Sequence, residues 1–590
     1  MGDIMRPVPF EELLTRIFDE YQQHHSIFGI PEQQFYSPAN QRRVSVFGES
    51  CATPIGPAAG PHTQLAQNII TAWLTGGRFI ELKTVQILDR LELDKPCIDA
   101  EDECFNTEWS TEFTLQKAWD EYLKAWFILH LLEEVFPFTP AKNGKSFIFN
   151  MSVGYNLEGI KQPPMQQFID NMMNAAGQPK FTQYRDTLNR WLHDDAFLTR
   201  LSLDDIRPRL ATLAERIPAK LVQGVTLSTM HGCPPDEIEA ICRYMLEEKQ
   251  LNTFVKLNPT LLGYPRVREI LDTCGFDYIG LNEESFEHDL KIGQALEMLT
   301  RLMALAKSKQ LGFGVKLTNT LGTVNNKGAL PGDEMYMSGR ALFPLSINVA
   351  ALLSREFDGK LPISYSGGAS QLNIRDIFET GIRPITMATD LLKPGGYLRL
   401  SQCMRELEQA DGWEMNQVDV KRLNALAEKA VSMEYTQKHW KPDDRIDVGE
   451  PLPLTDCYVA PCVSACAIKQ DIPEYIRLMG EQRYADALEL IYQRNALPAI
   501  TGHICDHQCQ YNNIRYHTHI CHPFFRCTAG KLLPASDEYF CKKLLYFFRL
   551  IIAQKTRYLH PRSPAFLIIC TGSLLYDRFS INLLPVQISL

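Results

Sequence analysis

The sequence contains no G-x-G-x-x-G fingerprint at any position. That fingerprint forms the pyrophosphate-binding turn of Rossmann domains, so no such site for NAD(P)H or FAD is predicted in this chain. No uninterrupted apolar run is long enough to cross a membrane, so no membrane span is expected. The first residues, MGDIMRPVPFEELL, lack a basic segment followed by an apolar one, which argues against a secretory signal and favours a cytoplasmic protein.

An excess of positive charge is also missing. The 590 residues include 60 Lys and Arg against 70 Asp and Glu, a formal net charge of −10. A chain of this charge is not expected to be a general nucleic-acid binder. The balance changes along the chain, because the residues from Asn513 to Leu590 carry ten Lys and Arg but only three Asp and Glu. The segment from residue 513 onward therefore differs in composition from the rest.

Cysteine is present in quantity, and its distribution is uneven. Of the sixteen cysteines, seven lie in the first 456 residues and nine in the last 134. In a reducing compartment, clustered cysteines indicate a metal or redox centre rather than disulfides.

Eight short apolar runs predict buried strands, because each run is continuous rather than alternating. Helical patterns separate them. In PPDEIEAICRYMLEEK, for example, Ile238, Ile241, Cys242 and Met245 recur at helical spacing after an acidic first turn. Alternating strands and helices predict an α/β (β/α)8 TIM barrel, with a doubly wound open sheet as the competing fold. The eight runs are FIELKTV from Phe79, FIFNMS from Phe147, GVTLS from Gly224, TFVKLN from Thr253, YIGLN from Tyr278, GFGVKLT from Gly312, PISYS from Pro362 and PITMAT from Pro384.

The pattern along the chain predicts five segments. They are an N-terminal helical segment over 1–45, the barrel over 46–400, a polar helical connector over 401–450, a small helical cysteine-containing domain over 451–512, and a tail of different composition over 513–590.

Polar and glycine residues follow most of the predicted strands. In a (β/α)8 barrel the active site forms at the carboxyl ends of the strands, so these residues are candidates for a site. Glycines after the seventh run and a hydroxyl after the eighth are suited to a phosphate held by backbone N–H groups. Buried lysines are suited to a negative charge developing on a flavin ring or a substrate. Helix caps and loop glycines are the competing interpretation of each single residue. The residues are Lys83 and Thr84, Asn150, Lys256, Asn319 and Thr320, Gly367 and Gly368, and Thr389.

Two groups of cysteines lie in the predicted small domain. Cys457, Cys462 and Cys466 have the spacing C-x4-C-x3-C, and Cys505 and Cys509 follow after a helical stretch. Thiolates from two separate segments can surround an iron–sulfur cluster. Zinc is the competing metal, although the usual C-x2-C pairs of zinc sites are absent. Buried inert cysteines are the third interpretation.

These motifs resemble known families. FIELKTV, KLTNTLG, SGRALFPLSINVA, SYSGGAS and ITMATDLL resemble the FMN-binding barrel of dihydroorotate dehydrogenases and dihydropyrimidine dehydrogenase. The cysteine region, with IPEYI after Cys466, resembles the α-helical ferredoxin domain of dihydropyrimidine dehydrogenase and of the glutamate synthase small subunit. The two together, over most of residues 1–512, resemble the selenate reductase iron–sulfur subunits of enteric bacteria. Members of that family are regarded as iron–sulfur flavoproteins of the NADPH-dependent oxidoreductase type, and they continue into FAD- and NAD(P)-binding domains.

The resemblance implies cofactors, partners and residue roles. It implies FMN in the barrel, a 4Fe-4S cluster in the small domain, and FAD and NADPH only in the longer relatives. It also implies redox partner subunits, including a molybdenum-containing oxidoreductase, and a small-molecule substrate of unknown identity. Lys83, Lys256 and Cys233 are the implied catalytic residues, with Cys233 displaced within the loop STMHGCPPDE from the place that the resemblance implies. Around FMN the implied residues are Ala59, Gly60, Lys83, Thr84, Asn150, Lys256, Asn319, Thr320, Gly339, Gly367, Gly368, Ala388 and Thr389; around iron they are Cys457, Cys462, Cys466, Cys505 and Cys509.

Two cysteines of the ferredoxin pattern are replaced. Leu454 stands three residues before Cys457, and Asn513 stands four residues after Cys509. The implied ligand set is therefore incomplete. Nothing from Asn513 onward resembles the family, and the hypothesis is a change of reading frame near that residue. Two alternative functions remain, a flavin-free barrel that serves as a binding scaffold and a zinc-stabilised protein with no redox role.

Overall fold

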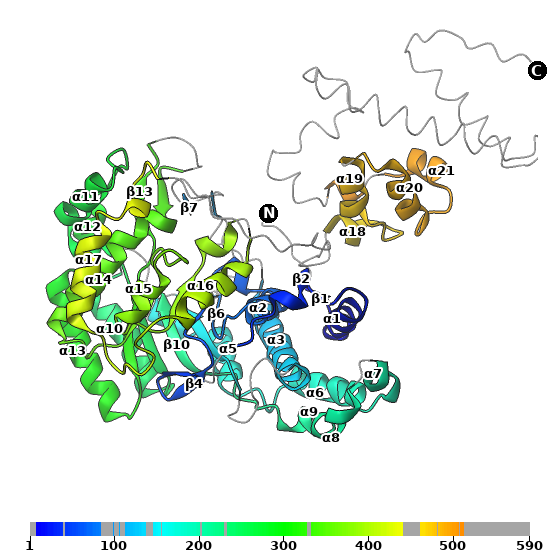
Figure 1. Cartoon of the computed structure of the whole chain (residues 1–590), viewed down its shortest axis with the longest axis horizontal. Helices are drawn as coiled ribbons and strands as arrows, with labels where there is room; N and C mark the ends of the chain where they lie inside the picture. Colours follow the sequence, from blue (N-terminus) through cyan, green and yellow to red (C-terminus); the bar gives the residue numbers. More distant parts are fainter. Residues whose placement is uncertain are drawn as a thin grey trace, which may run out of the picture. The chain divides into compact units, whose positions relative to one another are not determined.

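The protein is described from a computed structural model. The structure describes residues 7–38, 42–83, 98–99, 105–106, 113–136, 145–154, 156–200, 203–228, 233–326, 332–393, 395–440, 461–480, 482–506 and 508–511. The chain forms two compact units, one built mainly by Pro7–Cys457 and the other mainly by Tyr458–Leu590. Each unit is described by itself (Figure 1).

The first unit is a barrel of eight parallel strands in the order β5-β16-β15-β12-β11-β10-β9-β6. Its two end strands are joined by a backbone hydrogen bond of 2.8 Å, in which the N–H of Arg78 donates to the carbonyl of Ile55. The predicted (β/α)8 barrel is therefore confirmed. The strands are β5 (Ile55–Pro57), β6 (Phe79–Leu82), β9 (Ile148–Val153), β10 (Val222–Ser228), β11 (Asn252–Leu257), β12 (Phe313–Leu317), β15 (Ile363–Tyr365) and β16 (Ile385–Met387).

Seven of the eight predicted runs form barrel strands, but the run from Tyr278 does not. That run makes only an isolated bridge between Gly280 and Val324, and it leads into helix α12 (Glu283–His288). The remaining barrel strand is β5, whose three residues carry no run of β-branched side chains. Gly56 is required in β5, since a Cβ there would lie 1.8 Å from the carbonyl oxygen of Phe79. The first strand of the barrel is therefore β5, which precedes the first predicted strand in the sequence.

Amphipathic and buried helices surround the strands. In α10, Ile238, Ile241, Cys242 and Met245 are buried as their spacing predicts, with Asp236 and Glu237 in the first turn. Helix α3 is buried on almost every side and begins after Thr114, whose hydroxyl accepts a hydrogen bond from the N–H of Lys117. The helices that follow or cover the strands are α2 (Ala66–Leu74), α3 (Leu115–Val135), α5 (Pro163–Met173), α6 (Pro179–Leu192), α10 (Pro235–Glu247), α11 (Tyr264–Thr273), α12 (Glu283–His288), α13 (Ile292–Ser308), α14 (Phe343–Glu356) and α15 (Ile374–Glu379).

Two small additions flank the barrel. A four-stranded sheet has the order β13-β14-β7-β8 and combines segments that follow β12 and β6. A hairpin of β3 and β4 carries Phe47, whose ring packs against that of Phe254 with centroids 4.4 Å apart and planes inclined by 31°. Their bounds are β3 (Val44–Val46), β4 (Glu49–Cys51), β7 (Ile98–Asp99), β8 (Phe105–Asn106), β13 (Leu321–Val324) and β14 (Glu334–Met337).

Helices at both ends of the first unit pack on the barrel. Helix α1 (Phe10–His24) precedes the barrel, with a short pair β1 (Ser26–Ile27) and β2 (Ile30–Pro31) after it. After the last strand, α16 (Leu398–Glu408) contacts α15 and α17 (Val420–Ala430) contacts α14. The helical part of the segment predicted as a connector thus lies against the barrel. Short helices α4 (Leu157–Ile160), α7 (Asp195–Arg200), α8 (Arg207–Leu210) and α9 (Leu213–Arg216) complete this unit.

The second unit is a small set of helices. They are α18 (Pro461–Ala465), α19 (Ile472–Gly480), α20 (Tyr484–Tyr492), α21 (Pro498–Ile504) and α22 (Gln508–Tyr511). Leu478, Met479 and Ala487 form its core, with Tyr475 and Leu490 packed against them. The predicted tail over 513–590 lies outside the described residues. Among the helices described in either unit, none combines the length and the apolar character needed to cross a membrane.

Candidate functional site

Three predicted phosphate-binding glycines lie together at the carboxyl ends of the strands. Gly339 and Gly368 both have positive φ, of 77° and 71°, which L side chains rarely adopt. A Cβ at Gly368 would lie 2.7 Å from the Gly339 carbonyl oxygen and 2.8 Å from the N atom of Phe343. A Cβ at Gly367 would lie 1.8 Å from the Ser346 hydroxyl oxygen. We call Gly339, Gly367 and Gly368 the glycine cradle; a side chain at Gly367 or Gly368 would overlap Ser346 or the backbone of Gly339 and Phe343.

Thr389 also belongs to this end of the barrel. Its hydroxyl is hydrogen-bonded at 2.7 Å to the hydroxyl of Ser338, which precedes the cradle. Ala388 and Thr389 follow β16, while Ala59 and Gly60 follow β5. The two loops are joined because the Ala58 N–H donates to the Met387 carbonyl at 2.8 Å. These residues, which the sequence resemblance predicts around the cofactor, therefore lie at adjacent strand ends.

Inside the barrel, Lys316 and Glu81 form a buried ion pair that sequence reasoning missed. The Lys316 Nζ lies 3.0 Å from Glu81 Oε1, and the two side chains are 1% and 3% exposed. Lys316 also donates to the hydroxyls of Ser364 and Thr386. Burial lowers the pKa of Lys316 to about 8, although Glu81 acts in the opposite direction. A charged residue in the middle of each apolar strand was the only sequence signal for this pair.

Hydroxyl and amide groups extend the pair into a network. Thr226 donates to Glu81 Oε1 at 3.3 Å, and Thr386 donates to Oε2 at 3.1 Å. The predicted site residue Asn150 donates to the Thr226 hydroxyl at 2.7 Å and is itself buried. We call Glu81, Asn150, Thr226, Lys316, Ser364 and Thr386 the barrel network; its members come from six strands.

The predicted lysines lie near this network. Lys256 of β11 is the register partner of Lys316 on β12, and its positive charge also lowers the pKa of Lys316. Lys83 is buried just after β6, and its carbonyl accepts a hydrogen bond of 2.9 Å from the Tyr122 hydroxyl. Thr84 lies outside the described residues.

A chain of amides lies beyond β11 and β12. Asn319 donates to the Asn258 amide oxygen at 2.6 Å, and Asn258 donates to Asp289 at 3.1 Å. The Thr260 hydroxyl donates to the same Asp289 oxygen at 2.7 Å. These bonds orient the predicted site residue Asn319, and Thr320 follows it in the loop.

Cys233 lies beside the same amides. A small pocket is lined by Cys233, Asn258, Asp289 and the apolar side chains of Ile238, Leu257, Leu261 and Leu290. Burial, followed by the charge of Glu237, raises the pKa of Cys233 to about 11. The thiol therefore keeps its proton near neutral pH, and it is suited to donate a proton rather than to attack as a thiolate.

In the second unit the four described cysteines approach one aromatic side chain. Burial raises the pKa of Tyr475, and the nearby Cys509, Cys462, Cys466 and Cys505 raise it further. Cys462 is on α18 and Cys509 is on α22, and these helices are in contact. Within the described ranges no three His, Cys, Asp or Glu side chains are already arranged to hold a metal ion. Cys457 lies outside those ranges.

The site fits the predicted cofactors to different extents. Gly339, Gly368 and Thr389 provide backbone N–H groups and a hydroxyl of the kind that bind phosphate, whereas the N–H groups of Gly367 and Phe343 donate to the carbonyls of Leu317 and Arg340. Lysine and amide groups suited to a flavin ring or a substrate come from the neighbouring strand ends. For iron, the four described cysteines come from two segments, and with Cys457 they are the predicted thiolate ligands.

Known families match both units. Residues 28–438 match the family model for "Oxidoreductase YgfK, N-terminal TIM-barrel domain". Residues 453–520 match the model for dihydropyrimidine dehydrogenase domain II, 4Fe-4S cluster.

Among curated proteins, "Putative oxidoreductase YgfK" of Escherichia coli (strain K12) is 83% identical over 515 residues, which cover 87% of this chain and 50% of that protein. The chain thus spans about half the length of the curated relatives it matches at this level. A shorter match, 38% identical over 55 residues, covers 9% of this chain and 8% of the NADPH-Fe(3+) oxidoreductase subunit beta of Geobacter sulfurreducens.

Among solved structures, ligand-free type DHODH from Eimeria tenella is 16% identical and covers 68% of this chain and 96% of that one. Its TM-score of 0.34 is too low to support the fold, which the strand order establishes.

Proposed function

The chain belongs to the YgfK oxidoreductase family, and from that premise we propose that it is an iron–sulfur flavoprotein portion of an oxidoreductase. In this proposal the barrel binds FMN at the carboxyl ends of its strands. The small unit binds a 4Fe-4S cluster and passes single electrons between the flavin and a partner. Bound FMN would supply hydride and single-electron chemistry, which no amino-acid side chain provides.

The glycine cradle is the observation that carries the proposal. Backbone that crowds together without side chains, beside the start of a 14-residue helix, is suited to an anionic phosphate. Gly339, Gly367, Gly368 and Thr389 would hold the phosphate of FMN. Ala59, Gly60 and Ala388 would contact the cofactor from the adjacent loops.

The other site residues would surround the flavin ring and the substrate. Lys256 and Lys83 would offset negative charge that develops there. Asn319 is oriented through Asn258 and Asp289, so its amide would reach a ligand in one fixed position. Cys233 retains its proton and would serve as an acid in the pocket beside those amides.

The small unit would hold an incomplete iron site. Cys462, Cys466, Cys505 and Cys509, with Cys457, are the proposed ligands. With Leu454 and Asn513 in place of two cysteines of the ferredoxin pattern, we expect at most one cluster, and a labile one.

Partners would supply and accept the electrons. This chain covers about half the length of the first relatives, and we propose that FAD and NADPH bind in the part of those relatives that it does not cover. Two partial relatives are named as beta subunits, the NADPH-Fe(3+) oxidoreductase subunit and the NADP(+)-dependent formate dehydrogenase subunit of Moorella thermoacetica. They support a role within a larger assembly. A molybdenum-containing oxidoreductase is the partner class implied by the sequence resemblance.

Visible absorption of the anaerobically purified chain tests the proposal. The expected spectrum combines the structured bands of flavin with a broad absorption that dithionite bleaches. A colourless protein that stays flavin-free after incubation with excess FMN would overturn the flavin role. Zinc without iron in elemental analysis would support the zinc-stabilised alternative, and neither metal nor flavin would support the scaffold.

A further inference from the structure

Arg340 connects the glycine cradle to the last described segment of the barrel unit. It follows Gly339 directly and its side chain is 6% exposed. Its guanidinium donates to the carbonyls of Tyr435 at 2.6 Å, Gln437 at 2.8 Å and Trp440 at 3.3 Å. Its Cζ also lies 5.3 Å from the centroid of the Trp440 ring. One buried cation therefore binds three carbonyls of the segment Tyr435–Trp440, which we call the strap.

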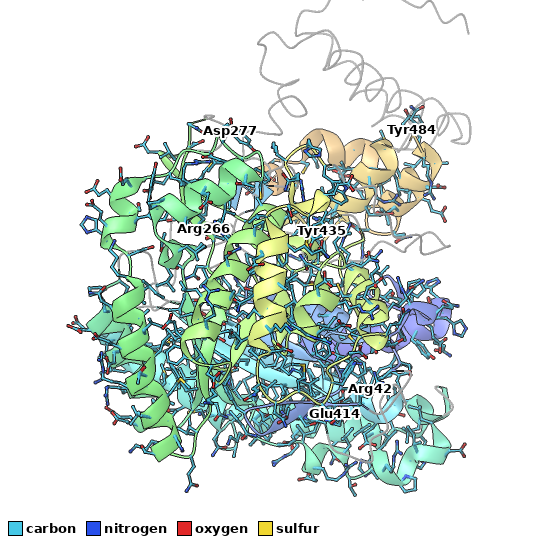
Figure 2. All side chains as sticks on the ribbon, turned by 60° about the vertical axis from the view of Figure 1, so that its left-hand side comes forward. Arg42, Arg266, Asp277, Glu414, Tyr435 and Tyr484 are labelled. Carbon is cyan, nitrogen blue, oxygen red and sulfur yellow. The ribbon has the colours of Figure 1, made fainter. Side chains whose placement is uncertain are left out.

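The strap also contacts the other side of the cradle. The ring of Tyr435 lies 6.1 Å from the ring of Phe343, the first residue of α14, whose N atom borders Gly368. Tyr435 is labelled in Figure 2, among the residues that follow α17. Farther along, the N–H of Lys438 donates to the carbonyl of Cys274 at 2.8 Å. The strap is thus fixed to the same backbone that forms the cradle.

The strap is also the last described part of the barrel unit. The strap ends at Trp440, and the cysteine-containing unit follows it in sequence. A ligand that orders the backbone of Gly339 and Arg340 also orders the point from which the Arg340 side chain extends to the strap. Docking of the strap and binding in the cradle both involve the backbone of Gly339 and Arg340, so the two are coupled when both favour the same conformation of that backbone.

We propose that Arg340 is a positioning residue that couples FMN binding in the glycine cradle to docking of the strap. Phosphate in the cradle then holds the segment from which the chain continues to the iron–sulfur unit. This inference rests on the proposed binding of FMN. It adds that the flavin phosphate also orders the strap, the last described segment before the cysteine-containing unit in the sequence.

Hydrogen exchange on the unmodified full chain tests the coupling without any substitution. FMN is expected to slow exchange of the strap amides by about five- to 150-fold, the usual range of such coupling. Riboflavin has the same ring but no phosphate, so it is expected to leave strap exchange unchanged. Inorganic phosphate alone is expected to slow it in part. Slowing by riboflavin equal to that by FMN would overturn the role of the cradle.

Variants of Arg340 test the residue itself. Linkage requires that the factor by which FMN slows strap opening equals the factor by which the docked strap tightens FMN. Arg340→Met is therefore expected to weaken FMN by that same factor and to abolish the FMN-dependent protection. Arg340→Lys keeps the charge but loses the fork that binds several carbonyls, so it is expected to restore only part of the FMN affinity and, by the same factor, only part of the protection.

Arg383→Met is the matched control. Arg383 also donates to three carbonyls, those of Gly381, Gly412 and Trp413, and its Cζ lies 4.6 Å from the centroid of the Phe378 ring. It precedes the amino end of β16, whereas Thr389 follows the carboxyl end. This variant is expected to retain both FMN affinity and protection of the strap. FMN binding with unchanged strap exchange in the unmodified chain would refute the coupling and leave the proposed function intact. Absence of FMN binding would refute both.

Discussion

Replacing Glu81 with glutamine isolates one charge within the barrel. The Glu81→Gln side chain has nearly the same shape, but the carboxylate that lies 3.0 Å from Lys316 is lost. Removing one partner of a buried ion pair typically costs about 3–5 kcal/mol, because the other charge remains buried. The hydroxyls of Ser364 and Thr386 still accept from Lys316. Loss of the Lys316 proton also limits the cost, since its pKa is already lowered to about 8. We therefore expect a loss of about 2–3 kcal/mol in the free energy of unfolding.

The double variant distinguishes the interaction energy between Glu81 and Lys316 from the cost of burying each side chain. Lys316→Met alone leaves Glu81 without its cation and is expected to cost a similar amount. In Glu81→Gln with Lys316→Met both charges are absent, so the cost should fall at least 1 kcal/mol below the sum of the single costs. Ser364→Ala removes one hydroxyl partner only and should cost about 1 kcal/mol.

Denaturant unfolding followed by tryptophan fluorescence measures these costs. All seven tryptophans lie at or before Trp440, so the signal reports the barrel unit and not the cysteine-containing unit. Values should be compared at fixed pH, near 7. A cost below about 1 kcal/mol for Glu81→Gln, or single costs that add within about 0.5 kcal/mol in the double variant, would contradict the ion pair.

Other consequences can be measured separately. The folded state releases the Lys316 proton near pH 8 and the unfolded state near 10.5, so stability relative to Lys316→Met should rise by roughly 3 kcal/mol between these pH values, and denaturation at several pH values checks the sign. Gly367→Val should abolish FMN binding in a fluorescence titration, because its Cβ would lie 1.8 Å from the Ser346 oxygen, whereas Gly322→Ala, with no atom within 4 Å, should not. The isolated chain should not reduce a dye with NADPH at a useful rate, and robust activity would show that a nicotinamide site exists here. Iron and sulfide analysis should give at most one 4Fe-4S cluster per chain; two clusters stable in air would show that the ligand assignment is wrong.

Local patterns predicted the parts of the fold that local forces determine. The helical spacing in PPDEIEAICRYMLEEK predicted the buried face of α10, since an amphipathic helix is readable from adjacent residues. Seven strands were readable because each is a continuous apolar run. Strand β5 was missed because its three residues, Ile55, Gly56 and Pro57, are held by neighbouring strands rather than by their own propensity.

The candidate site likewise contains residues that the sequence predicted and residues that it did not. Gly339, Gly367 and Gly368 were predicted from their places in short motifs, and the structure brings them together. The pairing of Glu81 with Lys316 depends on the closed barrel, which places residues far apart in sequence 3.0 Å apart. The sequence of one strand does not show which residue of another strand lies beside it in the barrel. A charged residue inside an apolar strand indicates only that an interior partner exists.

The barrel network also links stability to the geometry of the site. Its hydrogen bonds join β6, β9, β10, β12, β15 and β16, so they fix the strands whose carboxyl ends carry the candidate residues. A buried polar network that is fully bonded constrains positions more narrowly than apolar packing does, because each donor and acceptor has a preferred direction. Lys256, the register partner of Lys316, lies next to this constraint. A substitution at Glu81 should therefore change ligand binding at the strand ends as well as the free energy of unfolding, even though Glu81 is buried below them.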